Sequence, residues 1–117
     1  MESEKGPTPS LLCDMDAAID RMGSWDLYVD IAQAFAASLP ESEAAIERAI
    51  EQASWAEARR LVHSLKSNCA AMGAEALRRR VYLLEKVCAD ADAGAVERLL
   101  PPLREELRLL REELQAL

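Results

Sequence analysis

The chain has 117 residues, half of them apolar and only 4% aromatic, and it carries a net charge of −7. This length suits one domain with a substantial core, and the composition favours helices packed on helices, so we expect an all-α fold. The negative charge argues against nonspecific nucleic-acid binding, and no apolar run approaches the length of a membrane span, so we expect no membrane insertion.

Three cysteines, Cys13, Cys69 and Cys88, bear on the cellular compartment. Their number is odd, and they lack the close spacing of a zinc site. Free thiols in a reducing environment explain them better than a disulfide framework does. We therefore expect a cytoplasmic protein.

The opening MESEKGPTPS lacks the basic and apolar regions of a signal peptide. We interpret residues 1–9 as a disordered leader and expect one helical domain at 10–117. Apolar residues recur at helical spacing at the start of this domain and stop at Gly23, which is a natural residue for a helix end. They predict a short first helix through Leu12, Met15, Ile19 and Met22.

Pro40 divides the next stretch into two predicted helices. Ser24 can cap the first of them. Pro40 disfavours the helical backbone conformation at Leu39, which would end this helix. Its expected buried stripe is Leu27, Ile31, Phe35 and Ser38 or Leu39. The helix after the proline would bury Ile46, Ala49, Ile50 and Ala53.

The fourth predicted helix carries the only histidine of the chain, His63. Ser54 and Glu57 form the pattern of a capping box at its start, and Gly73 ends it. Its apolar stripe is Ala58, Leu61, Val62, Leu65, Cys69 and Met72. With about 100° between successive residues, His63 lies roughly 140° from the centre of that stripe, so its imidazole should face solvent.

Two further helices complete the predicted domain. One spans about 74–89 and buries Leu77, Val81, Leu84 and Cys88. The last follows a break at 90–94, and Pro101 and Pro102 would kink or restart it. After the prolines it carries the series Leu103, Leu107, Leu110, Leu114 and Leu117.

The neighbours of His63 on its helix favour a function for this side chain. At three- and four-residue spacings lie Arg59, Lys66, Ser67 and Ala70. The small side chains of Ser67 and Ala70 leave the ring unobstructed, and Lys66 supplies a positive charge suited to an anion on the ring. The alternative is a histidine that is exposed on a polar face without a role.

The motif around His63 resembles that of a known family. It reads HSLKSNCAAMGAEAL and is similar to H-x-L-K-G-S-x-x-x-L-G-A-x-x-L, the signature of histidine-containing phosphotransfer (HPt) domains. The stretch AAIDRMGSWDLYVDIAQAF resembles the family's first two helices. SWAEARRLVHSLK resembles the approach to the histidine and LLEKVCADAD the following helix, so the resemblance covers nearly all of the chain from Leu11 onward.

This resemblance implies an up-down four-helix bundle with a short additional N-terminal helix. It also implies a phosphocarrier in a two-component multistep phosphorelay, whose exposed histidine exchanges a phosphoryl group with receiver-domain aspartates. His63 matches the phosphorylated residue, and Lys66 matches the lysine that offsets phosphate charge. The family's usual Gly and Ser after that lysine are Ser67 and Asn68 here, which makes the surface beside the ring slightly bulkier.

Glu85 falls where the family often has Gln or Glu near the imidazole. In an antiparallel hairpin that turns at Gly73, the heights of His63 and Glu85 are similar, so the carboxylate can reach a ring nitrogen. We expect Glu85 on Nδ1, with Nε2 as the reactive atom. Arg78 and Tyr82 are further candidates for the border of a docking surface.

The chain lacks a glycine-rich nucleotide loop and a carboxylate cluster for Mg²⁺ near His63, so we expect neither ligand on it. The resemblance implies receiver domains of response regulators or hybrid kinases as partners, and these would bring the acceptor aspartate and the Mg²⁺. The chain would then be a carrier and not an enzyme.

Two other functions compete with this interpretation. A two-metal bundle uses Glu-x-x-His pairs, but position 60 is Arg60. A non-catalytic interaction module could pair its leucine series with another chain, but the series covers only about two heptads. We therefore expect the leucines to pack internally and the protein to be a monomer.

Overall fold

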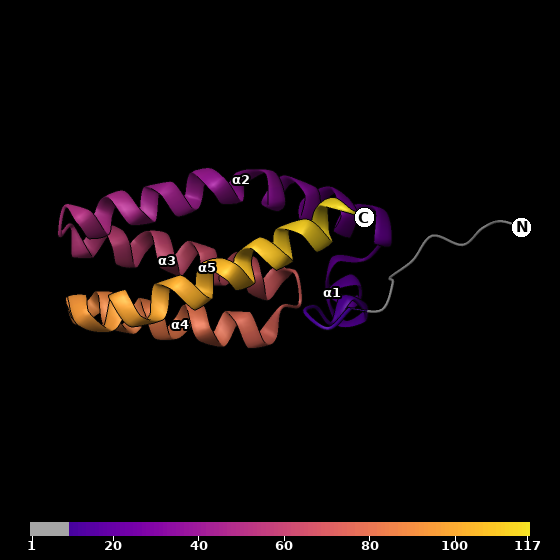
Figure 1. Ribbon diagram of the computed structural model, residues 1–117. Helices are drawn as coiled ribbons and strands as arrows, with labels where there is room; N and C mark the ends of the chain where they lie inside the picture. Colours follow the sequence, from indigo (N-terminus) through magenta and orange to yellow (C-terminus); the bar gives the residue numbers. More distant parts are fainter. Residues whose placement is uncertain (1–9) are drawn as a thin grey trace, which may run out of the picture.

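The computed structural model describes residues 10–117, which form five helices (Figure 1). They are α1 (Met15–Met22), α2 (Trp25–Glu51), α3 (Trp55–Ala71), α4 (Glu75–Ala89) and α5 (Ala93–Gln115). No strand occurs in this part of the chain, so the all-α prediction is confirmed. The leader predicted at 1–9 lies outside the described residues.

The four long helices form an up-down bundle. α3 packs against both α2 and α4, and α5 closes the bundle by packing against α4 and α2. Figure 1 shows the short α1 at the end of the bundle where the α3–α4 turn lies and where α5 finishes. This is the architecture that the resemblance implied. None of the helices between residues 10 and 117 combines the length and the hydropathy of a membrane span.

The prediction that a helix ends at Pro40 is wrong, because α2 continues through this residue to Glu51. Pro40 has no N–H, so the carbonyl of Ala36 loses its intrahelical donor. Leu39 before the proline and Ile46 after it are both buried on the same core. Their packing outweighs the local restriction, and Pro40 itself lies on the exposed side of the helix.

The buried stripe of the first half of α2 also differs from the prediction. Leu27 and Ile31 are 44% and 38% exposed, whereas Tyr28 and Ala32 are fully buried. Tyr28 turns inward because its hydroxyl donates a hydrogen bond to the Met72 carbonyl, 2.9 Å away. Of the other predicted positions, Phe35, Leu39, Ile46 and Ala49 are buried, Ile50 is half-buried, and Ser38 and Ala53 are exposed.

In α5 the two prolines neither end nor restart the helix, which runs unbroken from Ala93 to Gln115. Pro101 and Pro102 are exposed. The leucines that follow point into the bundle, and Leu103, Leu107, Leu110 and Leu114 are all buried. The series is therefore core, as expected, and its buried members cannot pair with another chain.

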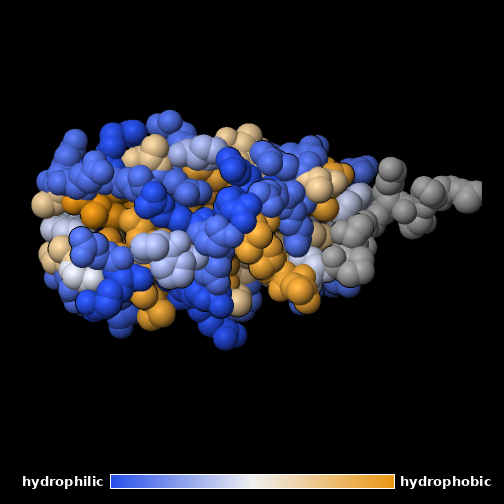
Figure 2. All heavy atoms as spheres, in the orientation of Figure 1, coloured by the Kyte–Doolittle hydropathy of each residue, from blue (hydrophilic) through white to orange (hydrophobic). Residues whose placement is uncertain are grey.

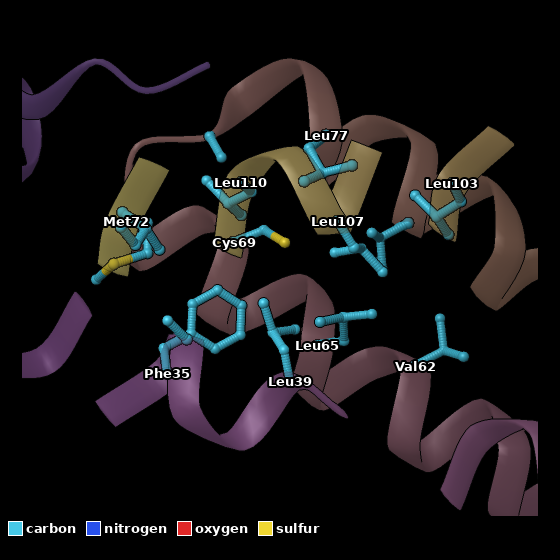
Figure 3. Close-up of a cluster of buried hydrophobic side chains, with 14 of the residues drawn as sticks. Phe35, Leu39, Val62, Leu65, Cys69, Met72, Leu77, Leu103, Leu107 and Leu110 are labelled. Atoms are coloured by element: carbon cyan, nitrogen blue, oxygen red, sulfur yellow. The ribbon is translucent and has the colours of Figure 1, made fainter. Parts of the chain in front are cut away.

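The core is a single cluster to which all four long helices contribute (Figure 3). Side chains from α2, α3, α4 and α5 point toward one another, among them Phe35, Leu65, Cys69, Leu77 and Leu107.

The three cysteines are free and buried. Burial raises the pKa of the Cys13 thiol to about 11 and that of Cys69 to about 12, so both remain protonated at neutral pH. Figure 2 shows that the outer face in view is mostly hydrophilic, with apolar patches between.

The predicted end of α1 at Gly23 and the predicted cap of α2 at Ser24 are confirmed, but the predicted capping box of α3 is not. Gly23 adopts the left-handed conformation after α1, and the Ser24 hydroxyl accepts a hydrogen bond from the Leu27 N–H at 3.0 Å. Ser54 precedes α3 without a side-chain capping bond. The capping box is therefore absent, and Glu57 pairs instead with Arg60 at 2.6 Å.

Gly73 joins the bundle to the segment before α1. Its φ is +80°, and a Cβ at this position would overlap the Asp14 carbonyl oxygen. The Asp14 N–H donates to the Gly73 carbonyl at 2.9 Å, so the two backbones touch here. Only glycine satisfies both the left-handed conformation and the close approach.

We expect Gly73→Ala to lower the free energy of unfolding by about 1–3 kcal/mol, because it combines backbone strain with overpacking. Gly23→Ala is the matched control, since Gly23 has φ +107° but no atom within 4 Å of the added Cβ. It should cost only about 1 kcal/mol. Urea denaturation of both variants checks this, and equal losses would show that the Asp14 contact is unimportant.

Candidate functional site

The structure places His63 on the solvent side of α3, as the periodicity predicted. Its neighbours Val62 and Leu65 are buried in the core. The His63 side chain is 57% exposed. The apolar stripe thus fixes the helix orientation and leaves the imidazole accessible to a second molecule.

Glu85 of α4 holds one nitrogen of the ring. His63 Nδ1 lies 2.9 Å from Glu85 Oε2. An ionised carboxylate can only accept a hydrogen bond, so in the neutral ring Nδ1 carries the proton and Nε2 carries the lone pair. The predicted contact between Glu85 and Nδ1 is confirmed. It leaves the lone pair of Nε2 on the side of the ring away from Glu85.

Lys66 lies on the other oxygen of the same carboxylate. Its Nζ is 2.8 Å from Glu85 Oε1, and its side chain is only 19% exposed. The approach is off the hydrogen-bonding direction, and Oε1 has no hydrogen-bond partner among residues 10–117. We therefore describe the contact as a close ion pair. One carboxylate joins the imidazole to the ammonium.

These contacts set the charge of Glu85. Burial raises the pKa of this carboxyl, but the close ammonium of Lys66 and the hydrogen bond of His63 outweigh it, and the net pKa is lowered. Because the pKa is lower than in the unfolded chain, the pairing contributes stability above the usual glutamate pKa. That contribution is lost as the pH falls through the folded-state pKa. At neutral pH the carboxylate is ionised.

The remaining predicted residues lie along the same α3–α4 surface. Arg59 and Ser67 are exposed on α3, and Ala70 is half-buried. The Ser67 hydroxyl donates to the His63 carbonyl at 3.3 Å, and Arg78 of α4 is ion-paired with Glu75 at 2.7 Å. The ring is held at Nδ1 by Glu85, and 57% of the His63 side chain stays exposed.

Two features of this surface were not predicted from the sequence. The Arg21 guanidinium of α1 donates to the Ala70 carbonyl at 3.1 Å, which brings a further cation to the α3–α4 surface. No spacing rule could place it, because the contact depends on how α1 crosses the bundle end. Lys66 Nζ also lies 5.0 Å from the centroid of the Tyr82 ring. The antiparallel pairing of α3 and α4, which lets Glu85 reach the imidazole ring, also places Tyr82 beside Lys66, so this contact could have been predicted.

In this bundle a buried carboxylate holds one nitrogen of an exposed imidazole, an arrangement that can carry a group on the other nitrogen. The family model described as Hpt domain matches residues 30–117, well over half of the chain. The chain therefore belongs to the Hpt domain family, whose members are phosphocarriers in histidine phosphotransfer and not kinases. The match begins within α2, so α1 lies outside it. No curated protein and no solved structure matches the chain.

Replacing Glu85 with Ala should change the tautomer of His63, because Nδ1 loses the acceptor that holds its proton. The ¹⁵N chemical shifts of the ring should move from a single tautomer toward a mixture. Phosphorylation by a small donor should slow by about tenfold or more, because a hydrogen bond to a charged group is worth about 1.5–3 kcal/mol. Glu97→Ala, at an exposed glutamate of α5, is the control. Unchanged ring shifts would show that Glu85 does not fix the tautomer.

Proposed function

We propose that the protein is a phosphocarrier in a two-component multistep phosphorelay, in which His63 accepts and donates a phosphoryl group in exchange with receiver-domain aspartates. The observation that carries this proposal is the 2.9 Å contact of Glu85 with Nδ1 of a half-exposed imidazole. It leaves the Nε2 lone pair available for attack. Membership of the Hpt domain family supplies the class of reaction.

In the proposed reaction, the Nε2 lone pair attacks the phosphorus of a receiver's aspartyl phosphate in line with the leaving oxygen. The N–P bond forms as the P–O bond breaks, and the aspartate leaves as a carboxylate. Nε2 carries no proton, so no base is needed. The ring gains positive charge, which the Glu85 carboxylate stabilises through the Nδ1–H hydrogen bond.

Lys66 has the charge to stabilise the phosphoryl group, but it is paired with Glu85 before the reaction. Lys66 lies one turn from His63, where an ammonium can exchange the carboxylate for the incoming phosphate oxygens. Glu85 then keeps its hydrogen bond to Nδ1. The ion pair thus holds the lysine beside the ring until it is needed.

Lys66→Ala should reduce the rate of phosphorylation or the lifetime of phosphohistidine by about three- to tenfold, because one partly exposed charge is lost. The fold should persist, and circular dichroism should be unchanged. Arg98→Ala removes a cation from an exposed position of α5, outside the surface around His63, and is the control for net charge. Identical kinetics in Lys66→Ala and the wild type would remove the proposed role of Lys66.

The receiver would bring the acceptor aspartate and Mg²⁺. Across residues 10–117, no three His, Cys, Asp or Glu side chains lie together as metal ligands would. We propose that the receiver docks on the surface around His63 formed by Arg59, Ser67, Ala70, Arg78 and Tyr82. Its arginines and Lys66 complement the negative charge of an aspartyl phosphate. We further propose that the protein acts as a monomer in the cytoplasm, where free thiols persist.

Incubation with a panel of phosphorylated receivers tests this function. The expected result is an acid-labile, base-stable label on the chain, with loss of label from one or a few receivers. A small donor such as phosphoramidate serves as a second source. If neither the receivers nor phosphoramidate labels the protein, the proposed function is wrong.

A further inference from the structure

Tyr82 of α4 lies within cation–π distance of two lysine ammonium groups. Lys66 Nζ is 5.0 Å from the ring centroid, and Lys86 Nζ is 5.8 Å from it. The ring itself is partly open to solvent, since Tyr82 is 43% exposed. Of the two lysines, only Lys66 also contacts Glu85, the residue that holds the imidazole.

Lys66 follows His63 by three residues on α3, and Tyr82 precedes Glu85 by three residues on α4. The contact between Tyr82 and Lys66 therefore lies about one helical turn closer to the α3–α4 turn than the contact between Glu85 and His63. Residues three apart on a helix share a face, so Tyr82 and Glu85 present their side chains to α3 together. The ammonium of Lys66 is therefore held from two sides, by the carboxylate and by the face of the ring. This explains why the Lys66 side chain is only 19% exposed, although lysine is usually exposed.

We infer that Tyr82 is a positioning residue that holds the Lys66 ammonium beside the His63 imidazole, ready for a phosphoryl group; this inference rests on the proposed function. A free lysine side chain samples many rotamers, and restricting it costs conformational entropy. The ring offsets that cost by attracting the cation. When phosphate arrives on Nε2, Lys66 can leave Glu85 and still keep the face of the ring beneath its ammonium.

The role of the ring differs from that of a docking residue. A docking residue acts only when a receiver is present, whereas a positioning residue acts with any phosphodonor. Phosphoramidate is small enough to reach His63 without a docked protein. The rate at which it phosphorylates His63 therefore separates the two roles.

The test compares Tyr82→Leu with Tyr82→Phe, using phosphoramidate and the full chain. Tyr82→Leu should slow phosphorylation of His63 about two- to fivefold, which corresponds to a cation–π interaction of roughly 0.5–1 kcal/mol. Tyr82→Phe keeps the ring and should restore the wild-type rate. Lys86→Ala removes the other cation from the same ring and should leave the rate unchanged. In a Lys66→Ala background, Tyr82→Leu should have no further effect.

A second measurement does not depend on phosphorylation. The ε-methylene protons of Lys66 should show an upfield ring-current shift that is kept in Tyr82→Phe and lost in Tyr82→Leu. A wild-type rate in Tyr82→Leu, or an equal slowing by Tyr82→Leu with and without Lys66, would overturn the inference. Absence of label on the wild-type protein would instead contradict the proposed function, and the ring-current shift would still show whether the ring holds Lys66.

Discussion

His63→Gln is expected to abolish phosphoryl acceptance while the bundle remains folded. The chain has no second histidine, so no other imidazole can accept the group. His63 is 57% exposed and its core neighbours are unaffected. A glutamine amide can still donate a hydrogen bond to Glu85, so the free energy of unfolding should change by only about 0.5 kcal/mol.

The measurement is the incorporation of label from a phosphorylated receiver and from phosphoramidate, followed by a test of acid and base stability. Circular dichroism and urea denaturation of the same preparation check that the variant is folded. Ser64→Gln, at the exposed neighbouring position of α3, is a control that keeps His63. An acid-labile, base-stable label on folded His63→Gln would show that another residue carries the phosphoryl group.

The geometry around His63 could be predicted because two strong patterns determine it. The apolar stripe of α3 has an unambiguous helical period, and it turns His63 outward whatever the rest of the fold does. Gly73 fixes where the α3–α4 hairpin turns, which permits Glu85 to reach Nδ1, and the resemblance to the HPt family pointed to this residue. Both patterns are local to one hairpin, so no knowledge of the other helices was needed.

The errors arose where long-range packing overrode a local rule. Pro40 disfavours helix in the preceding residue, but the burial of Leu39 and Ile46 on one core keeps α2 continuous. The shift of the α2 stripe toward Tyr28 depends on a hydrogen bond to Met72, 44 residues away. The pairing of Lys66 with Glu85 was not predicted, and it arises because the buried Glu85 carboxylate requires a cation nearby.

Ser67→Arg is expected to block transfer from a phosphorylated receiver. Ser67 is exposed one helical turn beyond His63. Its hydroxyl donates a hydrogen bond to the His63 carbonyl, so this small side chain leaves space beside the ring for a partner. In-line transfer requires the reacting atoms to approach to roughly 3–3.5 Å. A displacement of only about 1 Å can cost on the order of a hundredfold in rate, and a long arginine side chain would hold the two proteins further apart than that.

The same variant should still be phosphorylated by phosphoramidate, because a small donor needs no docking surface and Nε2 is unchanged. Ser67→Gly should stay close to the wild-type rate with both donors. Ala37→Arg adds the same charge at an exposed position of α2, and it is the control for net charge. If neither the receiver nor phosphoramidate phosphorylates Ser67→Arg, the substitution has disturbed His63 itself. If it accepts phosphate from the receiver at the wild-type rate, the receiver must approach the imidazole from another side, and the docking surface proposed around Ser67 is wrong.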